Sequence, residues 1–185
     1  MGRDKAFLES GGSTLLQRAL HIAASVSEHV AIVGEPAKFA AFAPVVPDIY
    51  SDHGPLGGIH AALSSSNVEV NLMLAVDLPF VDSRFLDYLI SQADESSAVV
   101  TVPFIAGRYQ PLCAVYRRAF AVLAEKALAG GKNRIDALFA QVPLCIINDE
   151  ELSQAGWTAG VFRNVNTPEE WEQAKRELES QAQHL

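Results

Sequence analysis

The fold is decided by residues 70–80, which read VNLMLAVDLPF. An apolar run of strand length ends in the carboxylate Asp77, and a proline follows at position 79. Continuous apolar runs are typical of strands covered on both faces, as in a parallel sheet. Because ligands of open α/β sheets bind beyond the carboxyl ends of the strands, Asp77 stands where a ligand is expected. The alternative is an aspartate that only serves a turn or a helix start.

Strand-like and helix-like segments alternate along most of the chain, outward from this stretch. Helices are predicted at 14–25, 37–42, 59–63, 82–92, 117–129, 135–140 and from 168 onward. Strands are predicted at 30–33, 45–46, 70–77, 98–102, 110–116, 144–147 and 162–165. Such alternation predicts an α/β fold with a mostly parallel, Rossmann-like sheet and helices on both faces. The length predicts a single domain over residues 1–185.

Composition excludes several classes of protein. Half of the residues are hydrophobic and 19% are charged, which is typical of a globular chain. A net charge of −8 argues against a nucleic-acid partner, and no apolar run is long enough for a membrane span. Cys113 and Cys145 lack a CxxC motif and histidine partners at ligand spacing. We therefore expect free thiols and a cytoplasmic location.

Residues 51–59, which read SDHGPLGGI, predict a glycine-rich loop that leads into a helix. The pair Gly57 and Gly58 would let the backbone approach a ligand closely, and the helix start would offer free N–H groups. A glycine-rich connection alone is weak evidence, because most such loops are only turns. This one precedes the strand before Asp77 by a single predicted helix, so both are expected to face one crevice.

Five motifs stand in order along the chain: RDKA at 3–6, GPLGG at 54–58, VDLP at 76–79, QPL at 110–112 and NVNTPEE at 164–170. Together they resemble the molybdenum cofactor guanylyltransferase family of nucleotidyltransferases. The resemblance implies transfer of GMP from GTP to the phosphate of molybdopterin, with release of pyrophosphate. It also implies partners among molybdenum-cofactor biosynthesis or molybdoenzyme-maturation proteins.

The resemblance assigns nucleotide-site roles to five residues. Asp77 matches the carboxylate that holds Mg²⁺ over the nucleotide phosphates, which suits a hard cation with oxygen ligands. Lys5 matches a lysine that contacts those phosphates, and both residues are implied to be catalytic. Asp48 matches a carboxylate that binds the nucleotide, and Gly57 and Gly58 belong to the same binding loop.

The pterin substrate is assigned to Asn164 and Asn166, again by resemblance. Their amide groups can both donate to and accept from a pterin edge. A loop with a helix cap is the alternative, and Thr167 already provides the cap. Arg108, Lys132 and Arg134 could add positive charge for the second substrate, but ordinary surface charge is the better interpretation of all three.

Two other functions stay open at this point. A related cytidylyltransferase would act on the same pterin, but its members tend to carry Gly-His-Pro where residues 107–112 here read GRYQPL. A non-catalytic remnant would bind the pterin or dock a partner protein without transferring a nucleotide.

The start of the chain departs from the family pattern. Members open with an apolar strand and a loop of the type Leu-Ala-Gly-Gly-x-Ser-x-Arg, whereas this sequence begins at the Met1-Gly2 that follows. Four buried side chains of such a strand would contribute about 6–12 kcal/mol, against a typical domain stability of about 5–15 kcal/mol. We expect the first strand to be absent, two strands to keep unpaired edges, and the chain as written to be a misassigned start or a fragment of doubtful activity.

Overall fold

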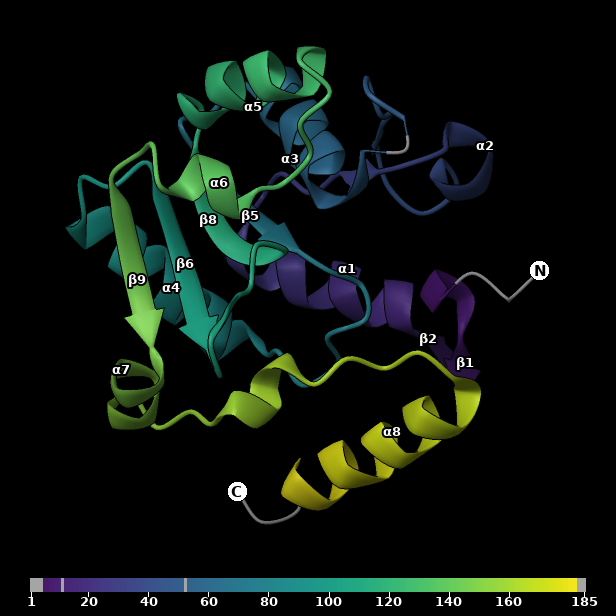
Figure 1. The fold of residues 1–185 in the computed structure, drawn as a ribbon. Helices are drawn as coiled ribbons and strands as arrows, with labels where there is room; N and C mark the ends of the chain where they lie inside the picture. Colours follow the sequence, from purple (N-terminus) through teal and green to yellow (C-terminus); the bar gives the residue numbers. More distant parts are fainter. Residues whose placement is uncertain (1–4, 11, 52, 183–185) are drawn as a thin grey trace.

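The computed structural model describes residues 5–10, 12–51 and 53–182 (Figure 1). Its helices are η1 (Lys5–Phe7), α1 (Leu15–Val26), α2 (Pro36–Phe39), α3 (Gly54–Ser65), α4 (Ser83–Glu95), α5 (Phe120–Ala129), α6 (Asp136–Phe139), α7 (Asp149–Gln154), η2 (Ala159–Phe162) and α8 (Pro168–Ala182). Its strands are β1 (Glu9–Ser10), β2 (Ser13–Thr14), β3 (Ile32–Val33), β4 (Val45–Val46), β5 (Val70–Leu74), β6 (Val100–Ile105), β7 (Arg108–Tyr109), β8 (Cys113–Arg117) and β9 (Leu144–Asn148).

The central sheet has the order β5-β8-β6-β7, and β9 pairs with β6. The prediction of a mostly parallel sheet is wrong for this sheet, since only β6–β9 is parallel and the β5–β8, β6–β8 and β6–β7 pairs are antiparallel. The reason lies in the connection after β6. Ala106 and Gly107 have φ of 49° and 76° and close a tight hairpin, so β8 returns beside β6 without a crossover helix.

A separate two-stranded sheet is formed by β3 and β4, which pair in parallel. Within the part of the chain that the structure describes, β3 pairs only with β4, and β5 pairs only with β8. Each of these strands therefore keeps one edge without a partner among the described residues.

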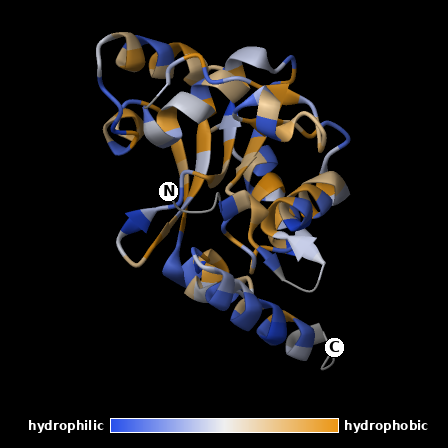
Figure 2. Cartoon of the chain, turned by 90° about the vertical axis from the view of Figure 1, so that its right-hand side faces the viewer, coloured by the Kyte–Doolittle hydropathy of each residue, from blue (hydrophilic) through white to orange (hydrophobic). Residues whose placement is uncertain are grey.

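Two apolar cores cover the two faces of the central sheet. Along β8, Cys113 and Val115 enter the core beneath α4, while Ala114 and Tyr116 enter the core beneath α3 and α5. This alternation follows from the period of two in a strand. The helices therefore cover both faces, as predicted, and Figure 2 shows the apolar strands in orange between them.

A third, smaller core packs α8 and the segment before it against the N-terminal residues of the described chain. It contains Leu8, Leu15, Val165, Trp171 and Ala174, all nearly inaccessible to solvent. Val76 and Phe80 pack against it from the segment that follows β5. Helix α8 is otherwise mostly hydrophilic in Figure 2, so it meets the body of the protein through one narrow apolar stripe.

Three differences between the predicted and observed elements affect segments that carry candidate site residues. The loop expected up to residue 58 ends earlier, because Pro55 favours the first turn and α3 begins at Gly54. Strand β5 ends at Leu74, so Asp77 lies in the following turn. The strand expected at 162–165 is absent. The 3-10 helix η2 ends at Phe162 instead, and residues 163–165 belong to no helix or strand.

Two further expectations concern thiols and membranes. Cys113 and Cys145 are free, as predicted, and burial raises the pKa of the Cys113 thiol to about 12. Cys145 is only partly buried. Over the described ranges, no helix combines the length and the apolar character that a bilayer span requires.

Candidate functional site

Asp77 lies in a turn between β5 and α4, and its side chain is 17% exposed. One carboxylate oxygen, Oδ2, lies 3.4 Å from the Lys5 ammonium. The same oxygen accepts a hydrogen bond from Asn164 Nδ2 at 3.4 Å. The burial cost of this carboxylate is therefore offset by one cation and one amide donor.

Lys5 connects Asp77 to the second asparagine. Its ammonium donates to Asn166 Oδ1 as well as contacting Asp77, and its side chain is about half exposed. Residues from three distant segments thus meet in one place: Lys5 from η1, Asp77 from the turn after β5, and Asn164 and Asn166 from the segment before α8. The structure brings together these four predicted site residues.

Backbone bonds and a helix cap fix the asparagine segment. Val165 N donates to Asp77 O at 2.9 Å, so the residue between the two asparagines is tied to the backbone of Asp77. Thr167 Oγ1 accepts from Glu170 N at 3.1 Å, and Glu170 Oε2 accepts from Asn166 N at 2.7 Å. The predicted cap of the last helix is confirmed, and it also orients Asn166.

The third core supports each of these segments through a neighbouring apolar residue. Leu8 follows the turn that carries Lys5, Val76 precedes Asp77, and Val165 separates the two asparagines. Since these residues pack in one cluster, the polar side chains beside them are held at the rim of that cluster. The site is therefore a consequence of local packing as well as of hydrogen bonding.

Asp48, Gly57 and Gly58 form a second group beside α3. A Cβ added to Gly58 would lie 3.9 Å from Asp48 Oδ1, which places the exposed Asp48 next to the start of the helix. A Cβ at Gly57 would lie only 2.8 Å from Tyr50 O, so close packing already explains this glycine. Among the described residues, no hydrogen bond or ion pair joins Asp48 to the Asp77 group.

The donor set at Asp77 decides which metal it suits. In the described part of the chain, no group of three or more His, Cys, Asp or Glu side chains could hold a metal ion. A transition-metal centre built from protein ligands alone is therefore not formed by these residues. Mg²⁺ usually binds through one or two carboxylates and completes its octahedron with water and substrate phosphates. A single Asp77 with amide neighbours fits that pattern.

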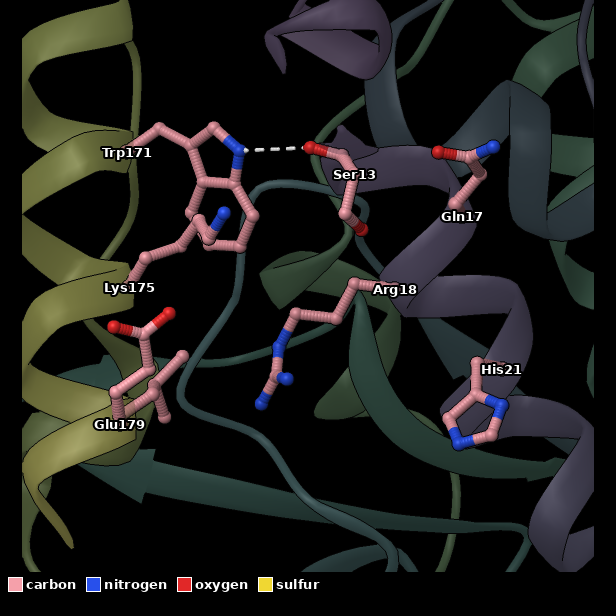
Figure 3. Close-up of a pocket in the computed structure, with 8 residues that line it drawn as sticks. Ser13, Gln17, Arg18, His21, Trp171, Lys175 and Glu179 are labelled. Carbon is pink, nitrogen blue, oxygen red and sulfur yellow. Dashed lines mark hydrogen bonds between the residues drawn. The ribbon is translucent and has the colours of Figure 1, made fainter. Parts of the chain in front are cut away.

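Two arginines near Asp77 were missed by the sequence analysis. Arg18, on α1, donates through Nε to Pro79 O at 2.7 Å, and burial lowers the pKa of its guanidinium. It lines a pocket of about 300 Å³ between α1 and α8, which Figure 3 shows with Trp171 donating to Ser13 O. Arg163 immediately precedes Asn164 and contacts Phe80 and Glu177. No motif indicates either arginine, because their partners are far away in the sequence.

Comparison with known proteins identifies the family. The model of the MobA-like NTP transferase domain matches residues 1–156. The chain belongs to the MobA-like NTP transferase family. The resemblance drawn from the five motifs is thereby confirmed, although Asn164, Asn166 and α8 lie beyond the matched range.

Relatives in this family cover nearly the whole chain. A probable molybdenum cofactor guanylyltransferase of Pelotomaculum thermopropionicum is 31% identical over 177 residues, which are 95% of this chain and 85% of that protein. The molybdenum cofactor guanylyltransferase of Desulfosudis oleivorans is 30% identical over 181 residues, 97% of this chain and 89% of that protein. This chain is therefore a member of the nucleotidyltransferase family, and its homologues are named molybdenum cofactor guanylyltransferases.

Solved structures confirm the fold. The molybdopterin-guanine dinucleotide biosynthesis protein A of Archaeoglobus fulgidus superposes with a TM-score of 0.79 at 23% identity, covering 97% of this chain and 92% of that chain. The 2-C-methyl-D-erythritol 4-phosphate cytidylyltransferase of Thermus thermophilus gives 0.67 at 18% identity, covering 95% and 94%. The α/β nucleotidyltransferase fold is shared by both structures.

Proposed function

We propose that this protein transfers GMP from GTP to the terminal phosphate of molybdenum-molybdopterin, forming the guanine dinucleotide cofactor and pyrophosphate. The observation that carries the proposal is the convergence of Lys5, Asp77 and the asparagine segment from three parts of the chain. A cation, a carboxylate and two amides in contact suit a reaction between two phosphate-bearing substrates. The names of the relatives supply the substrates.

In the proposed reaction, an oxygen of the pterin phosphate attacks the α-phosphorus of GTP. The new P–O bond forms as the bond to the β-phosphate breaks, and pyrophosphate leaves. Lys5 would turn from Asp77 and Asn166 towards the phosphates and offset their negative charge. Catalysis of this kind depends mainly on positioning and electrostatic stabilisation.

The other site residues have proposed roles in binding the metal ion and the two substrates. Asp77 would hold Mg²⁺, which when bound offsets the charge on the transferring and leaving phosphates. Asn164 and Asn166 would orient the pterin through amide donors and acceptors. Asp48 would accept from the N–H groups of the guanine edge beside Gly57 and Gly58. We further propose that molybdenum-cofactor biosynthesis or molybdoenzyme-maturation proteins deliver and receive the pterin.

The test incubates the purified chain with molybdopterin, Mg²⁺ and either GTP or CTP. We expect pyrophosphate release and a guanine dinucleotide product, measured by chromatography, only with GTP. Preference for CTP would overturn the guanylyl assignment. Binding of the pterin with no detectable Mg²⁺–GTP binding by calorimetry would show a non-catalytic binding module instead.

A further inference from the structure

Arg163 lies next to the candidate pterin residues, yet its side chain is directed at two other parts of the protein. Its guanidinium carbon lies 4.1 Å from the centroid of the Phe80 ring. Its Nη2 donates to Glu177 Oε2 at 2.7 Å. Phe80 belongs to the segment that follows Asp77, and Glu177 lies on α8. One side chain therefore links the asparagine segment to the Asp77 segment and to the last helix.

This link runs alongside a backbone bond between the same two segments. Val165 N donates to Asp77 O at 2.9 Å, two residues after Arg163 and three before Phe80. Two contacts at different points fix the relative position of two segments far better than one, because a single hydrogen bond can act as a pivot. Asn164 lies between the two contacts and donates to the Asp77 carboxylate.

Both partners of Arg163 are themselves held in place. Phe80 packs against the third core, where Val165 and Trp171 are buried. Glu177 accepts a second hydrogen bond from Gln173 Nε2 at 3.0 Å, and the bond from Arg163 is the main cause that lowers the pKa of the Glu177 carboxyl. The guanidinium is thus fixed between a ring face and a charged carboxylate, which are two favourable environments for arginine.

We propose that Arg163 is a positioning residue that sets Asn164 and Asn166 against Asp77 for the pterin phosphate. As far as the substrate is concerned, this inference rests on the proposed function. The role is separate from folding, since Trp171 and Ala174 anchor α8 in the third core without Arg163. Loss of the guanidinium should therefore loosen the asparagine segment while α8 stays docked.

The key variant is Arg163→Met, which keeps an unbranched apolar stem and removes the charge. We expect the KM for molybdopterin to rise about fivefold to tenfold, because the variant loses an exposed cation–π contact and an ion pair. The KM for GTP should stay within about twofold of the wild-type value. Arg163→Lys keeps a cation over Phe80 and should restore part of the loss. Phe80→Leu should reproduce the rise in KM, and adding Arg163→Met to it should cause little further change.

A matched control is available on α4. Arg84 also bonds a carboxylate, Asp82 at 3.2 Å, and lies over an aromatic ring, Trp157 at 5.5 Å, but it adjoins none of the four site residues. Arg84→Met should leave both KM values unchanged. The Tm values of Arg163→Met and Arg84→Met should lie within a few degrees of each other. A rise in KM in Arg163→Met alone would then reflect the position of the asparagine segment and not a general loss of stability.

A second readout does not depend on catalysis. Hydrogen exchange of the Val165 amide, followed by NMR, should become several-fold faster in Arg163→Met and stay unchanged in Arg84→Met. Wild-type exchange and an unchanged molybdopterin KM in Arg163→Met would overturn the proposal. If the wild-type chain transfers no GMP, the proposed function fails, and Val165 exchange alone decides whether Arg163 positions the segment.

Discussion

Asp77 serves the site through both its side chain and its backbone. The carboxylate contacts Lys5 and Asn164, whereas the carbonyl oxygen accepts from Val165 N. Only the first of these functions depends on the identity of the residue. The candidate chemistry at this position can therefore be removed without removing the hydrogen bond that fixes the asparagine segment.

Asp77→Ala should lower turnover at least about a hundredfold, the usual scale for loss of a group that stabilises charge in the transition state. The free energy of unfolding should change by no more than about 1 kcal/mol, since the backbone bond stays and the partly exposed ion pair contributes little. Steady-state kinetics and urea unfolding check the two parts. Asp87→Ala, which removes an exposed carboxylate on α4, is the control and should alter neither. Near-normal turnover in Asp77→Ala would contradict its assignment.

Helices were easier to predict from the sequence than strand directions. The cap residues Thr14 and Thr167 lie within three positions of their partners, so short-range patterns were sufficient to locate α1 and α8. The direction of β8 depends instead on the hairpin at Ala106 and Gly107, where a glycine signals a turn but not which strand pairs across it. The motifs predict Lys5, Asp77 and the asparagines as site residues, and the structure brings their side chains together. Arg163 was not predicted, because Phe80 and Glu177 lie in other segments.

Gly57 and Gly58 have different neighbours within the first turns of α3. Gly57→Ala should destabilise the protein by about 1–3 kcal/mol, because the new Cβ would lie 2.8 Å from Tyr50 O and force a backbone shift. Gly58→Ala places its Cβ at ordinary distances, 3.7 Å from Val33 Cγ1, and should be neutral or stabilising by up to about 1 kcal/mol. Urea unfolding of the two variants compares them directly. Equal stabilities would show that Tyr50 moves freely.

At the scale of the whole molecule, the central sheet and the candidate site depend on different cores. The two large cores fix β5, β6 and β8, while the third core fixes the segments that carry Lys5, Asp77 and the asparagines. A mutation in the third core should therefore damage the site before it damages the sheet.

Trp171→Ala tests this division. The indole is 2% exposed and donates to Ser13 O at 3.4 Å, so its removal should cost about 3–5 kcal/mol. Amide exchange should accelerate at Leu8, Val76 and Val165 well before it does in β6 and β8. Val122→Ala, at a side chain that is 73% exposed on α5, is the control and should change stability little. If amide exchange in β6 and β8 accelerated as much as at Leu8, Val76 and Val165, the third core would not be separate from the sheet.

The third core also has a consequence for synthesis on the ribosome. Leu8 is among the first described residues to be made, yet its partners Trp171 and Ala174 are among the last. A nascent chain can form the sheet of β5, β6, β8 and β9 while α8 is still inside the exit tunnel, but it cannot yet hold Lys5 against Asp77 and Asn166. We therefore expect the contacts among Lys5, Asp77 and Asn166 to form only after α8 has emerged from the tunnel and packed on Leu8.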